Sequence, residues 1–208
     1  MCGIVGYIGE NQAVPVLLNG LSKLEYRGYD SAGISVYHDG IHTIKVKGKL
    51  AGLREKVEKD DKKSSHIGIG HTRWATHGGV TTENAHPHRQ GLVTLIHNGI
   101  IENYLELKKR LIAKGYVFKS ETDTEVVTLL LDYYFDGDLL KALSRVMHRI
   151  EGSYALGILN KDNPDEIIAV KKDSPLIVGH TDGGSILASD VPAVLKYTRN
   201  VYFIENEE

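Results

Sequence analysis

The order in which strand-like and helix-like segments follow one another most limits the fold of this 208-residue chain. Short apolar runs bounded by turn residues predict strands at residues 3–9, 32–38, 41–47, 66–72, 92–97, 153–159, 166–170, 185–188 and 201–204. Helical spacing and capping boxes predict helices at residues 14–26, 50–59, 103–115, 122–133 and 139–149. Strands and helices come in separate groups instead of alternating singly. This grouping predicts an α+β fold rather than a parallel sheet of βαβ units.

The charge balance is close to neutral, with 25 Lys and Arg against 27 Asp and Glu and a net charge of −2. A general nucleic-acid or anionic-membrane binder would carry a basic excess, so we expect neither nucleic acid nor membrane as a partner. No apolar run approaches the ~20 residues that span a bilayer. Glu10, Asn11 and Pro15 interrupt the N-terminal segment, so we expect no secretory signal.

The chain has one cysteine, Cys2, directly after the initiator methionine. A single thiol forms neither an internal disulfide nor a cysteine-rich metal site, and it fits a reducing compartment, so we expect a cytoplasmic protein. If Met1 is removed, Cys2 carries both a thiol and an α-amine with an ordinary pKa of about 7.7–8.0. One residue then supplies nucleophile and base. The alternative is a small buried side chain on the first strand.

The segment HTRWATHG, residues 71–78, gathers polar side chains after a predicted strand. Arg73 offers a planar fork of donors that suits a carboxylate, and Thr76 and His77 add donors nearby. Trp74 is the single tryptophan and lies in a polar loop instead of an apolar run. The alternative is an ordinary strand-to-loop junction with a packed tryptophan.

Asn98-Gly99 and Asp123 each allow two interpretations. Asn-Gly is the preferred dipeptide of a two-residue hairpin turn, but it also supplies a side-chain amide and a backbone N–H, the donors of an oxyanion hole. Asp123 follows Thr122 in the first turn of a predicted helix. Its carboxylate either favours the positive end of the helix dipole or accepts hydrogen bonds from a substrate ammonium group.

Histidines gather in the middle of the chain. Six of the ten fall within residues 66–97, at His66, His71, His77, His86, His88 and His97. Their spacing matches no His-Glu-x-x-His motif and no carboxylate pair accompanies them, so we expect hydrogen-bonding histidines and no metal.

Several motifs occur together and in a particular order. They are MCGIVG (1–6), EYRGYDSAG (25–33), HTRWATHG (71–78), NAHPH (84–88), HNGIIEN (97–103) and SETDTE (120–125). Together they resemble the class II glutamine amidotransferase domain, and the resemblance covers essentially the whole chain. It implies a four-layer αββα sandwich of the N-terminal nucleophile (Ntn) hydrolase type, with two mainly antiparallel sheets and Cys2 at the end of a central strand.

The resemblance also implies catalytic roles. Cys2 attacks the side-chain amide of glutamine, and a glutamyl thioester is then hydrolysed to glutamate. Asn98 and the Gly99 N–H stabilise the oxyanion, and the Gly99 carbonyl holds the substrate α-amine. Arg27 and Gly28 help to position the nucleophile. No cofactor is implied.

Substrate-binding roles follow from the same match. Arg73 holds the α-carboxylate of L-glutamine, with help from Thr76 and His77. Asp123 holds the α-amine. His86 matches a family position beside the glutamine-covering loop.

The resemblance is nearest to family members that continue into two sugar-phosphate isomerase domains, which take up the ammonia and belong to homo-oligomers. In these members Trp74 lies in the glutamine-covering loop and gates the ammonia route. We expect residues 1–208 to be one glutaminase domain, with those isomerase domains absent from this sequence.

Two alternatives stay open. One is the glutaminase domain of another class II enzyme, such as an amidophosphoribosyltransferase, although Trp74 and the segment at residues 84–88 favour the first assignment. The other is a non-catalytic module that binds glutamine.

Overall fold

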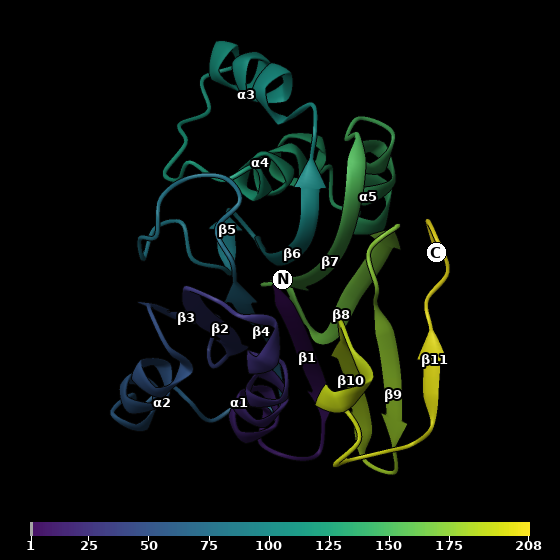
Figure 1. Ribbon diagram of the computed structural model, residues 1–208. Helices are drawn as coiled ribbons and strands as arrows, with labels where there is room; N and C mark the ends of the chain where they lie inside the picture. Colours follow the sequence, from purple (N-terminus) through teal and green to yellow (C-terminus); the bar gives the residue numbers. More distant parts are fainter. Residues whose placement is uncertain (1) are drawn as a thin grey trace.

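Two antiparallel sheets form the centre of the structure, a computed structural model that describes residues 2–208 (Figure 1). The larger sheet has seven strands, in the spatial order β11 (Val201–Phe203), β9 (Ile177–Thr181), β10 (Gly184–Ala188), β1 (Gly3–Gly9), β4 (Ile67–Arg73), β2 (Ser31–Tyr37) and β3 (Ile41–Lys47). The smaller sheet has four, in the order β5 (His88–Gln90), β6 (Val93–Ile101), β7 (Gly152–Asn160) and β8 (Asn163–Lys172).

Helices cover the outer face of each sheet, which makes four layers (Figure 1). The larger sheet is covered by α1 (Ala13–Lys23) and α2 (Leu50–Glu58). The smaller sheet is covered by α3 (Tyr104–Ala113), α4 (Thr124–Tyr134) and α5 (Leu139–Met147). Two short 3₁₀ turns, η1 (Glu25–Arg27) and η2 (Val191–Ala193), complete the regular structure.

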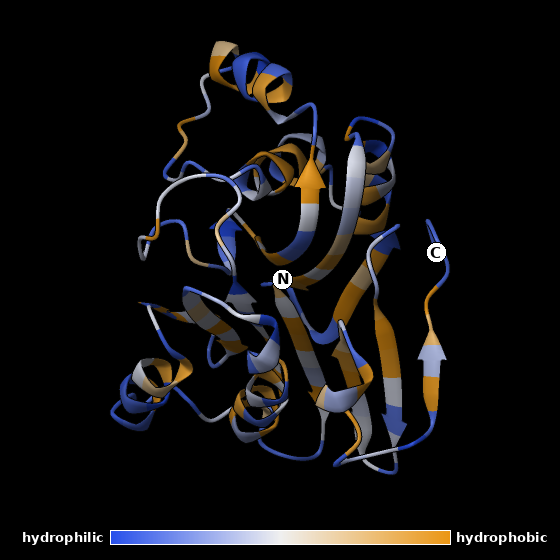
Figure 2. Cartoon of the chain, in the orientation of Figure 1, coloured by the Kyte–Doolittle hydropathy of each residue, from blue (hydrophilic) through white to orange (hydrophobic). Residues whose placement is uncertain are grey.

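The central strands are apolar on both faces because each face is covered. In β1, Ile4 belongs to the core between the two sheets, whereas its neighbour Val5 packs with Leu17 and Leu21 of α1. Successive side chains of a strand point to opposite faces, so a strand buried on both sides reads as a continuous apolar run. Figure 2 shows the apolar residues concentrated on the central strands and on the inner sides of the helices.

Glycines in β4 allow the close approach of α1. A Cβ atom on Gly68 would lie 2.9 Å from Leu17 Cδ1, and one on Gly70 would lie 3.1 Å from Leu21 Cδ1. The two glycines therefore serve helix–sheet packing.

The prediction of an α+β fold with antiparallel sheets in an αββα sandwich is confirmed. Two strands, β5 and β9, were not predicted. β5 is a three-residue edge strand of polar side chains, so it carries no apolar alternation to reveal it.

The hairpin-turn interpretation of Asn98-Gly99 is wrong. β6 continues to Ile101, and Asn98 and Gly99 pair with Ala155 and Tyr154 of β7. Pairing with β7, more than fifty residues further along the chain, overrides the local turn signal. The continued strand also buries Ile101 completely, which favours pairing over a turn.

The two predicted capping boxes, at residues 103–106 and 122–125, do not form, because neither helix has a side-chain cap at its N-terminus. The Asn103 side chain instead joins the connection between α5 and β7, where it donates to the Arg149 carbonyl and accepts from the Glu151 N–H. α4 begins at Thr124, and Glu125 accepts from the backbone N–H of Ser120, upstream of the helix. The Asn103 and Glu125 side chains thus form hydrogen bonds with the backbone of neighbouring connecting segments instead of capping their own helices.

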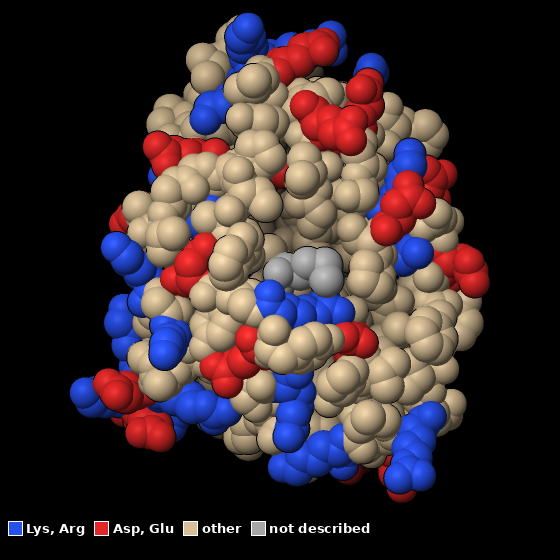
Figure 3. Space-filling view, in the orientation of Figure 1, with Lys and Arg blue, Asp and Glu red and all other residues tan. Residues whose placement is uncertain are grey.

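Acidic and basic side chains are interspersed over the face shown in Figure 3. In the described part of the chain, no helix has the length and apolar composition needed to cross a bilayer.

Candidate active site

A cavity of about 360 Å³ opens next to Cys2, at the beginning of β1. Sequence-predicted site residues from four separate segments meet in it. Its lining residues are Cys2, Arg27, Trp74, Thr76, Asn98, Gly99, Ser174 and Pro175.

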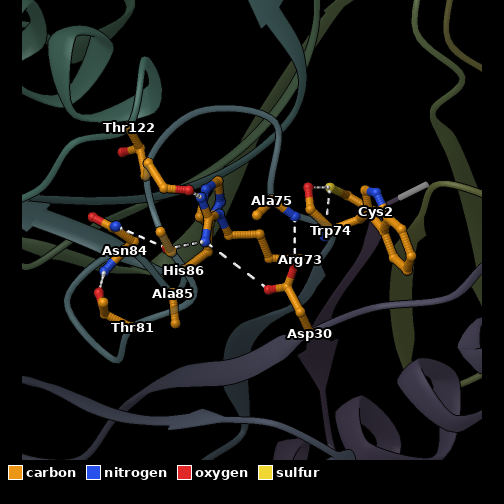
Figure 4. Close-up of polar contacts among 12 residues, drawn as sticks. Cys2, Asp30, Arg73, Trp74, Ala75, Thr81, Asn84, Ala85, His86 and Thr122 are labelled. Carbon is orange, nitrogen blue, oxygen red and sulfur yellow. Dashed lines mark hydrogen bonds and ion pairs between the residues drawn. The ribbon is translucent and has the colours of Figure 1, made fainter.

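The Cys2 thiol is held by the backbone of Trp74. The Trp74 N–H donates to Sγ at 3.2 Å, and the thiol lies 3.6 Å from the Trp74 carbonyl oxygen, to which it donates (Figure 4). Burial raises the pKa of the thiol, and the Trp74 N–H and the nearby Arg73 charge offset this only in part. The thiol is therefore protonated at neutral pH and needs a base to become a nucleophile. The predicted base is the α-amine freed by removal of Met1, and this prediction lies outside the described residues.

Asn98 and Gly99 both line the cavity beside Cys2. The Asn98 side chain is 7% exposed, and its Nδ2 donates to the Cys2 carbonyl oxygen at 3.3 Å. Gly99 has a φ of +128°, and a Cβ atom there would lie 2.0 Å from the Ser153 carbonyl oxygen. Only glycine fits this position, so the strand can pass the cavity with its backbone close to the nucleophile.

Arg27 links Cys2 to the segment after β10. Its guanidinium donates to the Cys2 carbonyl oxygen at 3.4 Å and to Asp190 Oδ2 at 2.8 Å. Gly28 has a φ of +76°, and a Cβ atom there would lie 3.1 Å from the Trp74 ring. Gly28 thus gives room to Trp74, whose side chain is 53% exposed beside the cavity.

Arg73 is buried and holds the loop that follows it. Its guanidinium donates to the carbonyl oxygens of His77, Gly78 and Gly79, at 3.2 Å for Gly79. Asp30, whose Oδ1 lies 4.0 Å from Arg73 Nη1, accepts the Ala75 N–H on its other oxygen (Figure 4). Arg73 and Asp30 therefore fix the covering loop, residues 74–79, at both ends.

Asp123 ties the start of α4 to the end of β6. Its Oδ2 accepts the Ile101 N–H at 2.8 Å, and its Oδ1 lies 3.9 Å from His77 Nδ1. Asp123 occupies the N-cap position of α4 without capping it through its side chain. The carboxylate is thus close to His77 of the covering loop.

The middle histidines form a buried, hydrogen-bonded group. His71, His86, His88 and His97 are all buried, and burial lowers the pKa of each, so they are neutral. His86 stacks on His71, and its Nδ1 accepts the His97 N–H at 3.3 Å. Within residues 2–208, no three His, Cys, Asp or Glu side chains are placed to hold a metal ion.

The structure does not bring every predicted residue to the cavity wall. Five predicted site residues are absent from its described lining: Gly28, Arg73, His77, His86 and Asp123. Gly28 and Arg73 nevertheless contact residues that line it or the covering loop. His86 is buried and stacks on His71, which in turn hydrogen-bonds to the lining residue Asn98.

Four residues near the cavity were not predicted. Ser174 and Pro175 line it, and Asp30 and Asp190 hold Ala75 and Arg27. Asp30 lies in the EYRGYDSAG motif and could have been noticed. Asp190 gives no such signal, because it reaches Arg27 across 163 positions of sequence.

A second hollow, of about 560 Å³, lies beside β3 and β5. Lys45 is part of its wall, and its ammonium group donates to the Glu83 and Ala85 carbonyl oxygens at 3.1 and 2.6 Å. No sequence-predicted site residue belongs to its described lining.

An αββα sandwich whose central strand begins directly after a partly buried cysteine has the architecture of an Ntn-type amidotransferase domain. Residues 71–196 match the glutamine amidotransferase domain family, and the chain belongs to this family.

Curated relatives resemble the chain over its whole length. The glutamine–fructose-6-phosphate aminotransferase (isomerizing) of Caldanaerobacter subterraneus subsp. tengcongensis is 63% identical over 100% of this chain and 34% of its own length. The enzyme of the same name from Clostridium acetobutylicum is 54% identical over the same shares. The chain thus spans about a third of the length of these relatives.

Solved structures share the fold. A glutamine phosphoribosylpyrophosphate amidotransferase from B. subtilis, complexed with ADP and GMP, has a TM-score of 0.84 and 26% identity, over 98% of this chain and 44% of that one. A glutamine aminotransferase class-II domain protein from Silicibacter pomeroyi has a TM-score of 0.65 and 14% identity, over 99% of this chain and 92% of that one.

Proposed function

We propose that residues 1–208 form a glutaminase domain that hydrolyses L-glutamine to glutamate and ammonia through Cys2. The observation that carries this proposal is the meeting of Cys2, Asn98 and Gly99 in one cavity, with the Asn98 amide pointing to the Cys2 backbone. Membership of the glutamine amidotransferase family supports it.

The proposed reaction is acyl transfer in two halves. The Cys2 thiol transfers its proton to the α-amine and its sulfur attacks the carboxamide carbon, which makes a tetrahedral oxyanion. Asn98 Nδ2 and the Gly99 N–H stabilise that charge. The C–N bond breaks as the amine returns the proton to the leaving nitrogen, which releases ammonia. Water then attacks the thioester to give glutamate and to restore the thiol.

In the same proposal Arg73, Thr76, His77 and Asp123 bind the two charges at the amino-acid end of glutamine. Binding both charges places the side-chain amide at Cys2, which is a proximity effect. Two contacts support this arrangement. The Asp123 carboxylate lies close to the His77 ring, and the Arg73 guanidinium donates to a carbonyl oxygen of the covering loop.

Replacing Arg73 by alanine tests the carboxylate contact. A hydrogen bond to a charged group contributes about 1.5–3 kcal/mol, so the KM for glutamine should rise roughly 10- to 150-fold while kcat changes less. Exposed Arg110, paired with Glu106 on α3, is the matched control, and Arg110→Ala should leave the KM unchanged. A lower kcat at unchanged KM would instead assign Arg73 to loop ordering alone.

For the full-length protein, we propose that the ammonia serves the synthesis of glucosamine 6-phosphate from fructose 6-phosphate in sugar-phosphate isomerase domains. The names of the relatives at 63% and 54% identity support this substrate. The alternative, an amidophosphoribosyltransferase, rests on structures at 26% identity and is the weaker one. A homo-oligomeric full-length form and a cytoplasmic location belong to the same proposal, and the lone thiol supports the latter.

An intact-mass measurement followed by a glutaminase assay tests the function. We expect the mass to show loss of Met1, and glutamate and ammonia to appear in equal amounts from glutamine. A correctly processed domain that binds glutamine but releases no ammonia would support the non-catalytic module instead.

A further inference from the structure

The Asn98 side-chain amide is held at both ends by buried groups. Its Nδ2 donates to the Cys2 carbonyl oxygen at 3.3 Å. Its Oδ1 lies 3.0 Å from Nε2 of His71, which is fully buried in β4 on the neighbouring sheet. The amide is thus part of a short chain of hydrogen bonds that crosses between the two sheets.

This chain fixes the position of one proton. The Cys2 carbonyl oxygen is an acceptor only, so the amide must present its NH₂ group to it. The other end of the amide is then oxygen, and His71 Nε2 must carry a hydrogen to donate to it. A neutral ring with a proton on Nε2 has a bare Nδ1. Among the described residues, Nδ1 of His71 has no partner at hydrogen-bond geometry, although the His97 backbone lies near the ring.

The surroundings keep this ring neutral and in place. The His86 ring stacks on His71 with centroids 4.1 Å apart and planes at 16°. Burial is the main cause that lowers the pKa of His71 to about 3, so the ring does not gain a second proton at physiological pH. The stacked partner holds the ring in place and burial keeps it neutral, so the hydrogen bond to Asn98 decides which nitrogen carries the proton.

From this geometry we propose that His71 is a positioning residue for the glutaminase reaction, whose Nε2–H sets the orientation of the Asn98 amide. The inference rests on the proposed function, in which Asn98 Nδ2 stabilises the oxyanion. If the amide turned over, its oxygen would face the Cys2 carbonyl oxygen and its NH₂ would face the His71 N–H. Both contacts would be repulsive, and the oxyanion would meet an acceptor instead of a donor.

The kinetic test compares three substitutions with different donor reach. His71→Leu removes the donor, and kcat for glutamine hydrolysis should fall roughly 10- to 100-fold, less than the ~10²–10³-fold loss for an oxyanion donor itself. The KM should change less than threefold, because His71 is not expected to touch the amino-acid end of glutamine.

In His71→Gln the amide nitrogen can replace Nε2 and should restore kcat to within a few-fold of wild type. In His71→Asn the amide nitrogen takes the place of Nδ1 and should not. His66→Leu, at an exposed position just before the same strand, is the matched control.

A double-mutant cycle separates positioning from a structural role. If His71 acts through Asn98, His71→Leu should cause no further loss of kcat in an Asn98→Ala background. Equal losses in both backgrounds would overturn the proposal, as would a His71→Asn variant as active as His71→Gln. Thermal unfolding and iodoacetamide alkylation of Cys2 report whether each variant is folded with an accessible thiol. If the leucine variant does not fold, the glutamine and asparagine variants still decide.

An NMR measurement tests the hydrogen bond without reference to activity. In long-range ¹H–¹⁵N spectra of the wild-type domain, His71 should show a protonated Nε2 and an unprotonated Nδ1, unchanged from pH 6 to pH 8. The opposite tautomer would overturn the proposal. A wild-type domain with the expected tautomer but no glutaminase activity would instead contradict the proposed function.

Discussion

Replacing Cys2 by alanine is expected to abolish ammonia release from glutamine, with turnover falling on the order of 10⁴-fold or more. The reason is chemical rather than structural, because the thioester cannot form without the sulfur. Cys2 precedes β1, and its side chain contacts the Trp74 backbone at the edge of the cavity, so the fold should tolerate alanine. Ammonia release and the melting temperature, measured on the same preparation, check both statements.

Protein isolated with Met1 retained is the matched control, because it keeps the thiol and moves the α-amine away from it. It should also be inactive with glutamine, whereas Cys2 should still react with iodoacetamide. Full activity of either protein would disprove the N-terminal cysteine mechanism. Retained binding of glutamine by Cys2→Ala, measured by calorimetry, would show that binding and chemistry are separable.

Replacing Gly99 by alanine is expected to cause the largest loss of stability among single changes at this site, roughly 3–5 kcal/mol. Two costs add. The φ of +128° disfavours any residue with a Cβ atom, and that atom would lie 2.0 Å from the Ser153 carbonyl oxygen of β7. The β6–β7 pair would have to separate, which also moves the neighbouring Asn98 amide. Urea unfolding measures the loss of stability.

A substitution at Gly115 measures the first of these costs, the unfavourable φ, without the second, the steric clash. Its φ is +91°, yet among the described residues nothing lies within 4 Å of the position its Cβ atom would take. Gly115→Ala should therefore cost only about 1–2 kcal/mol, the penalty for a left-handed conformation. Equal losses for the two substitutions would show that the close approach at Ser153 does not matter.

The sequence predicts the layers of the fold better than the places where distant strands meet. The grouping of strands and helices indicates antiparallel sheets because strand alternation and helical spacing are local signals. Asn98-Gly99 shows the limit. The dipeptide has the local signature of a turn, but its pairing with residues 154 and 155 decides its conformation. β5 has no apolar pattern and could not be predicted in this way.

The candidate site was predictable where its residues lie in continuous motifs. Cys2, Arg27, Trp74, Thr76 and Asn98 all belong to such stretches and do line one cavity. Contacts that need the folded chain were not predictable. Asp190 reaches Arg27 only because the end of β10 lies near η1, and Arg73 is occupied by carbonyl groups of its own loop. No sequence spacing encodes these contacts.

Two parts of the site differ in how easily they open. Cys2 adjoins β1, which is paired with β4 on one side and β10 on the other, whereas the covering loop is not part of a sheet. Amides in a strand paired on both sides exchange with solvent only when a large part of the protein opens, whereas a loop held by a few hydrogen bonds opens at much lower free energy. Cys2 is attached directly to such a strand, and residues 74–79 form such a loop. In the proposed glutaminase reaction we therefore expect local opening of the loop to admit glutamine, while Cys2 stays in place as long as β1 remains paired.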